Sequence, residues 1–111
     1  MVEYAGHDLD LVYGALSNTS RRHVLERLVS SPARVTDLAD DFSMSLAGVS
    51  KHIRVLEDAR LVQRTINGRE HTLSLEPGPL AGAAAWLLAY RRFWEVRLDL
   101  LERRMREARN K

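Results

Sequence analysis

Hydrophobic residues in the first third of the chain follow the spacing of two short amphipathic helices. Those of the first helix recur three and four positions apart and share one face: Leu9, Val12, Tyr13 and Leu16. Asn18 comes next, and its side chain is of a type that caps a helix N-terminus. The apolar positions expected for the second helix are Val24, Leu25, Leu28 and Val29. Ser30-Ser31-Pro32 then ends this helix, because proline cannot continue it.

The next segment has the pattern of two helices joined by a short turn. The first is predicted to begin at about Thr36, a capping residue, and to end near Phe42. After a tight turn, Ser45 is expected to cap a longer helix over residues 45–59. Its buried face is formed by residues four and three apart, namely Val49, Ile53 and Leu56. In a helix-turn-helix of this kind, the second helix usually contacts nucleic acid.

After residue 60 the hydrophobic period changes from that of a helix to that of a strand. Two β-prone runs flank Asn67-Gly68, which is the strongest short signal for a hairpin. We therefore predict a hairpin over residues 61–75 with a type I′ turn, which requires positive φ at both Asn67 and Gly68. The expected cross-strand pairs are Ile66 with Arg69, Arg64 with His71, and Val62 with Leu73. This hairpin would form a wing whose tip carries Arg64 and Arg69.

Pro77-Gly78-Pro79 is expected to interrupt the chain before a last long helix over residues 79–108. Its apolar residues return in alternate steps of four and three, interrupted by Arg91: Leu80, Ala84, Leu87, Trp94, Leu98, Leu101 and Met105. A second stripe beside it consists of Trp86, Tyr90, Phe93 and Leu100. A helix of about 28 residues is about 42 Å long, more than a domain of this size covers. The seam favours pairing with a second copy of the chain; the alternative is a core helix within one chain.

Composition and charge fit one folded domain covering residues 1–111. Of its 111 residues 45% are hydrophobic and 29% charged, and there is no cysteine, which excludes disulfides and thiolate metal sites. Residues 1–50 carry 4 arginines against 7 acidic residues, whereas residues 51–111 carry 13 basic against 8 acidic residues. Arginine dominates the basic residues, which suits phosphate binding but also follows from a GC-rich genome. No signal peptide or transmembrane segment is predicted, so a cytoplasmic location is expected.

Four strings carry a resemblance to a known family: Leu16-Ser17-Asn18-Thr19-Ser20-Arg21-Arg22, Val35-Thr36-Asp37-Leu38-Ala39, Val49-Ser50-Lys51-His52-Ile53-Arg54-Val55-Leu56 and Ala59-Arg60-Leu61-Val62. With the order of elements, they resemble the ArsR family of winged helix-turn-helix transcriptional repressors over roughly residues 9 to 105. The resemblance implies a mainly α fold with a small β-hairpin, a winged helix-turn-helix over residues 8–76, and a homodimer through the first and last helices. It further implies that double-stranded operator DNA is a partner and that, as is usual in the family, a small-molecule inducer releases the repressor; autoregulation by protein concentration alone is the alternative.

The residues at the family's metal sites differ in this chain. Arg34-Val35-Thr36-Asp37-Leu38 stands where arsenic and cadmium sensors of the family have Cys-Val-Cys-Asp-Leu, and residues 79–111 contain no histidine. The four histidines fall in four different predicted elements: His7, His23, His52 and His71. We therefore expect no metal and no cofactor, as in a metal-independent branch that Tyr90-Arg91-Arg92-Phe93-Trp94 resembles. A metal held by two of the histidines across a dimer is the alternative.

The candidate DNA-binding residues lie on the outer face and flanks of the helix over 45–59, on the wing, and at the start of the second helix. They are Ser45, Ala47, Gly48, Ser50, Lys51, His52, Arg54, Arg64, Arg69 and Arg21. Lys51 and Arg54 can reach guanine or phosphate in the major groove, and Leu46 replaces a polar residue common in the family. Structural alternatives remain for several of them: local hydrogen bonding by His52, a solvated hairpin for the wing arginines, and an ion pair of Arg21 or Arg22 with Glu26.

The candidate dimerisation residues are Leu9, Tyr13, Leu80, Ala84, Leu87, Trp94, Leu98 and Leu101. We expect a dimeric, sequence-specific repressor that binds an inverted repeat, with no membrane partner. An enzyme is not expected, because the sequence has no phosphate-binding glycine loop, nucleophile elbow or paired acids beside a base. Two alternatives stay open: a winged helix that binds only proteins, and a repressor gated by a small molecule near Trp86, Tyr90 and Trp94.

Overall fold

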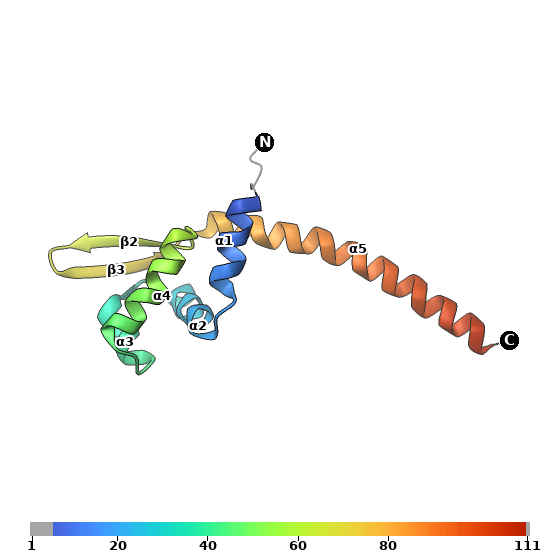
Figure 1. Ribbon diagram of the computed structural model, residues 1–111, viewed down its shortest axis with the longest axis horizontal. Helices are drawn as coiled ribbons and strands as arrows, with labels where there is room; N and C mark the ends of the chain where they lie inside the picture. Colours follow the sequence, from blue (N-terminus) through green and yellow to red (C-terminus); the bar gives the residue numbers. More distant parts are fainter. Residues whose placement is uncertain (1–5, 111) are drawn as a thin grey trace.

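A computed structural model describes residues 6–110, while residues 1–5 and 111 lie outside the described part (Figure 1). The expectation about a signal peptide falls largely on those first residues. The elements follow one another as α1 (Gly6–Leu16), α2 (Thr19–Ser30), β1 (Ala33–Arg34), α3 (Val35–Asp41), α4 (Leu46–Asp58), β2 (Val62–Asn67), β3 (Glu70–Leu75) and α5 (Pro77–Arg109). The mainly α class with a winged helix-turn-helix is confirmed, and the hairpin gains a short third strand.

Side-chain caps fix where two of the helices begin. The Asn18 side chain accepts a hydrogen bond from the Arg21 backbone N–H at 3.0 Å, and Ser45 Oγ accepts one from the Gly48 N–H at 3.0 Å. Both predicted caps are confirmed. The cap predicted at Thr36 is wrong, because α3 begins at Val35 and is preceded by Arg34 in an extended conformation. Arg34 is extended because it pairs with β3, so the chain passes directly from strand into helix.

The three strands form an antiparallel sheet in the order β1-β3-β2. The hairpin pairs Asn67 with Glu70, which moves the register by two residues and makes Gly68 and Arg69 the turn. The predicted type I′ turn is wrong: among the described residues only Ser43, Arg60 and Gly68 have positive φ, and Gly68 has φ +64°. One glycine at the first loop position closes the turn, and the last pair of the ladder is Asn67 with Glu70 in place of Ile66 with Arg69. A shift of two keeps every side chain on its predicted face.

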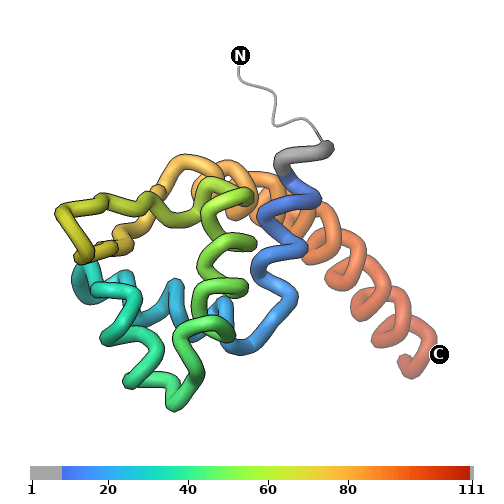
Figure 2. Tube along the Cα trace, turned by 60° about the vertical axis from the view of Figure 1, so that its left-hand side comes forward, coloured from blue at the N-terminus to red at the C-terminus, as the bar shows by residue number. Residues whose placement is uncertain are grey.

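The core lies between α2, α3, α4 and the inner face of the sheet (Figure 2). Its least exposed large side chains, at 0–1% exposure, are Val24, Leu38, Val49, Ile53, Leu56, Leu61 and Leu73. The predicted inner faces of α2 and α4 are therefore confirmed except at Val29, which is 73% exposed. Val29 follows Leu28 by about 100° of helix rotation, and Leu28 already fills the core side.

α5 begins on the domain body and then projects away from it (Figure 1). The Pro77-Gly78-Pro79 segment does not interrupt the chain before the helix but forms its first turn, where proline costs no hydrogen bond. Ala83 is buried against α1, and the Tyr13 hydroxyl donates a hydrogen bond to the Ala83 carbonyl at 2.8 Å. With 33 residues α5 is about 50 Å long. The described chain accordingly extends 72 Å along its longest axis.

Candidate nucleic-acid interface

The two faces of α4 differ sharply in burial. Val49, Ile53 and Leu56 are fully buried, which fixes the rotation of the helix. On the opposite side Lys51 and Arg54 are exposed, and neither forms an ion pair with any of the described side chains, residues 9–110. α4 therefore presents two uncompensated positive charges to solvent.

The N-terminal end of α4 is small and partly apolar. Ala47 is exposed, and Leu46 beside it is 53% exposed. A Cβ on Gly48 would lie 3.1 Å from Ser45 Oγ, so Gly48 leaves space for the hydroxyl that caps the helix. This end of the helix has little bulk between its backbone and a ligand.

Arg64 is not at the tip of the wing. Its guanidinium donates two hydrogen bonds to the Glu57 carboxylate of α4, at 2.8 and 3.1 Å, and contacts His71 Nδ1 at 2.9 Å. The expected backbone pairing of Arg64 with His71 is wrong, since Arg64 opposes Leu73, but the two side chains meet as diagonal neighbours. The hydrogen bonds to Glu57 raise the pKa of Arg64. The charge of Arg64 is therefore already balanced within the chain.

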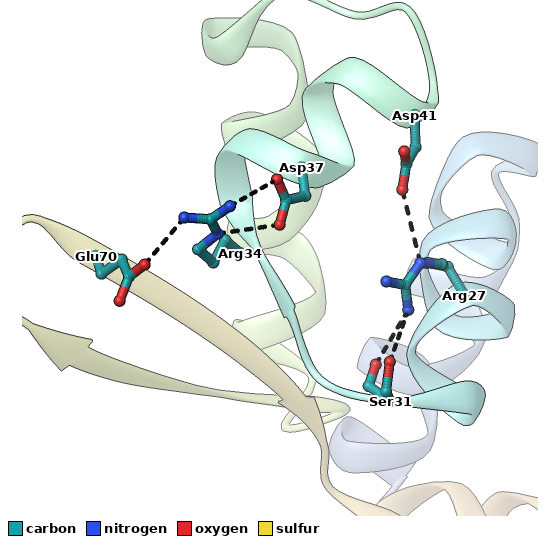
Figure 3. Close-up of polar contacts among 6 residues, drawn as sticks. All are labelled: Arg27, Ser31, Arg34, Asp37, Asp41 and Glu70. Atoms are coloured by element: carbon teal, nitrogen blue, oxygen red, sulfur yellow. Dashed lines mark hydrogen bonds and ion pairs between the residues drawn. The ribbon is translucent and has the colours of Figure 1, made fainter.

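A second ion pair ties the wing to α3 (Figure 3). Arg34 Nη1 lies 3.0 Å from Glu70 Oε1 on β3, while Arg34 Nε lies 3.0 Å from Asp37 Oδ2 on α3. The hydrogen bonds that Arg34 donates raise its pKa, and the bond to Asp37 contributes more than the bond to Glu70. The sequence reasoning missed this contact, because hydrophobic spacing carries no signal for a salt bridge between segments 36 residues apart.

Arg69 occupies the turn of the wing and is exposed. It makes no ion pair and no side-chain hydrogen bond within the described residues. Of the two arginines predicted at the tip, Arg69 alone is placed there with a free charge.

Arg21 connects α1 to α4. It donates hydrogen bonds to the carbonyls of Ala15 at 2.8 Å and Gly14 at 3.2 Å, and it contacts His52 Nδ1 at 3.4 Å. Arg22 likewise donates to the Leu16 carbonyl at 2.8 Å. Neither arginine forms an ion pair with Glu26 in the described part of the chain. Backbone carbonyls at the C-terminal end of α1, not an acidic side chain, accept their hydrogen bonds.

The candidate dimerisation residues divide into two groups. Leu9, Tyr13 and Leu80 are half-buried against the core of their own chain. Ala84 and the rest lie along the exposed part of α5, with Leu87 50%, Trp94 48%, Leu98 57% and Leu101 54% exposed. Aromatic rings join this exposed stripe: Trp86 stacks on Tyr90 at 5.2 Å between centroids, and the Tyr90 and Trp94 rings meet edge-on at 6.0 Å.

The histidines lie apart from one another. His23 stacks on Phe42, His52 contacts Arg21 and His71 contacts Arg64, while the His7 side chain lies outside the described part. Among the described side chains, residues 9–110, no group of three His, Cys, Asp or Glu residues is placed to hold a metal ion. In the same range no helix combines the length and apolar character needed to cross a bilayer.

Comparison with known proteins agrees with this geometry. Residues 16–65 match the family model of a helix-turn-helix domain. The HTH-type transcriptional regulator Rv2034 of Mycobacterium tuberculosis is 38% identical over 85 residues, which are 77% of this chain and 77% of that protein. The transcriptional repressor SdpR of Bacillus subtilis is 27% identical over 79 residues, covering 71% of this chain and 88% of its own. The crystal structure of an ArsR family transcriptional regulator aligns with a TM-score of 0.77 at 37% identity, over 86% of this chain and 97% of that one. The chain belongs to the ArsR family of winged helix-turn-helix proteins, which are DNA-binding regulators of transcription.

Proposed function

We propose that the protein is a homodimeric repressor that binds an inverted-repeat operator through α4 and the wing. The observation that carries this proposal is the outer face of α4, where Lys51 and Arg54 are exposed and unpaired while the inner face is fully buried. A helix of this kind fits the major groove of B-DNA, which is about 12 Å wide. One relative, SdpR of Bacillus subtilis, is a transcriptional repressor by name.

The residues divide by the contact each is proposed to make. Lys51 and Arg54 reach base edges or phosphates, and Arg69 reaches the backbone beside the minor groove. At the start of α4 the hydroxyls and small residues allow close approach of DNA: Ser45, Ala47, Gly48 and Ser50. Arg64 acts by holding the wing to α4, and Arg21 and His52 by holding α1 to α4, because their polar atoms already have partners.

A second copy of the chain is the proposed cover for the exposed stripe of α5. Trp86, Tyr90, Phe93 and Trp94 are each 47–48% exposed and lie on neighbouring turns of one helix. Contiguous exposed patches of several large apolar side chains are uncommon on monomers and mark interaction sites. A two-fold axis lets the same stripe pack against itself, and it places two copies of α4 on one side of a DNA duplex.

Selection from a random pool of duplex DNA at about 0.15 M salt tests this function. We expect enrichment of an inverted repeat with half-sites about 10 bp apart, one turn of the double helix. The double variant with Lys51→Ala and Arg54→Ala is the negative control. It should fold like the wild type, because both side chains are exposed, but it should not enrich the inverted repeat. A folded, dimeric protein that enriches no sequence would contradict the proposal and favour a winged helix that binds other proteins.

A specific observation favours one refinement, gating by a small molecule. A shallow cavity of about 340 Å³ is lined by Trp86, Ala89, Tyr90 and Phe93 on the exposed stripe of α5. Stacked aromatic rings bind flat apolar molecules. Indole is a suitable probe: by competing with the second copy for this surface it should release the protein from its operator. Ala89→Leu, which fills the cavity, should raise the indole concentration needed for release when both proteins occupy the operator to the same extent. Release of the wild type and of Ala89→Leu at the same indole concentration would exclude this site.

A further inference from the structure

A larger cavity opens on the proposed DNA-binding side of the molecule. It lies between the start of α3, the start of α4 and the wing, with a volume of about 450 Å³. Cavities of about 300–1,000 Å³ are the usual size for organic ligands, so this one exceeds what a single ion needs. Val35 and Leu46 give it an apolar lining, and Thr36, Ser50 and Arg69 line it with polar groups.

Three arginines and one carboxylate line this cavity, and some of its hydrogen-bond donors are free. The Glu70 carboxylate also lines it but is held by Arg34 at 3.0 Å (Figure 3). Thr36 and Ser50 form no side-chain hydrogen bond within residues 6–110, and Arg69 has no ion pair there. One guanidinium and two hydroxyls are therefore available to a ligand, beside an apolar surface. That combination suits an anionic phosphate attached to a sugar ring.

The position of the cavity selects the source of such a ligand. It has α4 on one side and the wing on the other. DNA that places its major groove on α4 and its minor groove at Arg69 must pass one backbone strand between them, since a backbone strand separates the two grooves. We infer that the cavity binds one sugar–phosphate unit of that strand, with Thr36 and Ser50 donating to the phosphate and Val35 and Leu46 against the deoxyribose. This inference rests on the proposed function.

The contact adds affinity without reading bases, because every nucleotide has the same sugar and phosphate. It also makes Thr36 a DNA-binding residue, which the spacing of hydrophobic residues does not indicate. The ion pairs of Arg34 with Glu70 and of Arg64 with Glu57 connect the wing to α3 and to α4, on two sides of the cavity.

Single-phosphate neutralisation tests the inference. One methylphosphonate is placed in turn at each backbone position of the selected operator, and the affinity is measured for the wild-type protein, Thr36→Val and Thr65→Val. Thr65 is the matched control, an exposed wing threonine outside the cavity. Neutralisation should weaken the wild type about tenfold at each contacted phosphate, the size of one charged hydrogen bond, and at one position per half-site this loss should depend on Thr36. Thr36→Val should lose about tenfold on unmodified DNA and less than about threefold more at that position, while Thr65→Val behaves as the wild type.

The other outcomes separate this inference from the proposed function. If the loss of affinity from Thr36→Val and the loss from the methylphosphonate multiply at every backbone position, while the wild type binds the operator, the cavity contact alone would be overturned. A wild-type protein that binds no duplex DNA would overturn both. Titration with ribose 5-phosphate, without DNA, checks the other source of the same chemistry: micromolar binding that Thr36→Val abolishes, together with independent losses on DNA, would assign the cavity to a free sugar phosphate and overturn the backbone assignment.

Discussion

Replacing Trp94 on the exposed stripe of α5 should separate association from folding. Trp94 is 48% exposed, and its ring meets the rings of Tyr90 and Phe93 on its own helix. An aromatic side chain presents roughly 150–250 Å², so about 100 Å² remains to be covered by a partner. At about 25 cal/mol per Å², this burial contributes about 2.5 kcal/mol per chain and about 5 kcal/mol per symmetric dimer. Trp94→Gln should therefore raise the dimer Kd by about three to four orders of magnitude.

Sedimentation equilibrium over a range of protein concentrations measures this change, and circular dichroism checks that helix content is retained. Arg92→Gln is the matched control, because Arg92 is exposed on the same helix but lies about 160° round from both Trp94 and Tyr90. Operator affinity should fall with the dimer for Trp94→Gln and stay unchanged for Arg92→Gln. A Trp94→Gln protein as dimeric as the wild type, or equal losses for both variants, would refute the assignment of this stripe as the interface.

Three further predictions concern α4 and the turn after it. Lys51→Ala should cost about 1–3 kcal/mol on the selected operator and relax specificity at one base pair, as measured by competition among operator variants; an equal loss on random DNA would mean a phosphate contact. Arg60→Gly should stabilise the fold by about 0.5–1 kcal/mol in urea denaturation, since Arg60 has φ +58°, a left-handed conformation that glycine adopts freely; unchanged or lower stability would contradict this. Leu56→Ala should destabilise the domain by about 3 kcal/mol in the same assay because Leu56 is fully buried, and a loss below about 1 kcal/mol would be inconsistent with that burial.

The parts of the fold that could be predicted are those specified by local sequence. Asn18 and Ser45 cap their helices through neighbouring backbone N–H groups, and Val49, Ile53 and Leu56 face the core as their spacing requires. In each case the deciding interaction lies within one turn of helix or one face of an element. The resemblance to the ArsR family rested on the same local strings.

The parts that could not be predicted depend on contacts between distant segments. Thr36 failed as a cap because β1 pairs with β3, nearly forty residues later, and holds Arg34 extended. The hairpin register moved because the turn closed with positive φ at Gly68 alone. At the candidate site, the Glu57 carboxylate that binds Arg64 could not be placed from either segment by itself. The charge on a residue is visible in the sequence, but its partner becomes visible only when the elements are packed.

The placement of the tryptophans has a spectroscopic consequence. The chain contains two, Trp86 and Trp94, and both lie on the exposed stripe of α5. The buried core therefore contains no indole, but the Trp86 ring meets the Tyr13 ring of α1 edge-on, at 6.1 Å between centroids. Emission from Trp94 reports whether water reaches the exposed stripe and so follows assembly, whereas emission from Trp86 also follows the packing of α5 on α1.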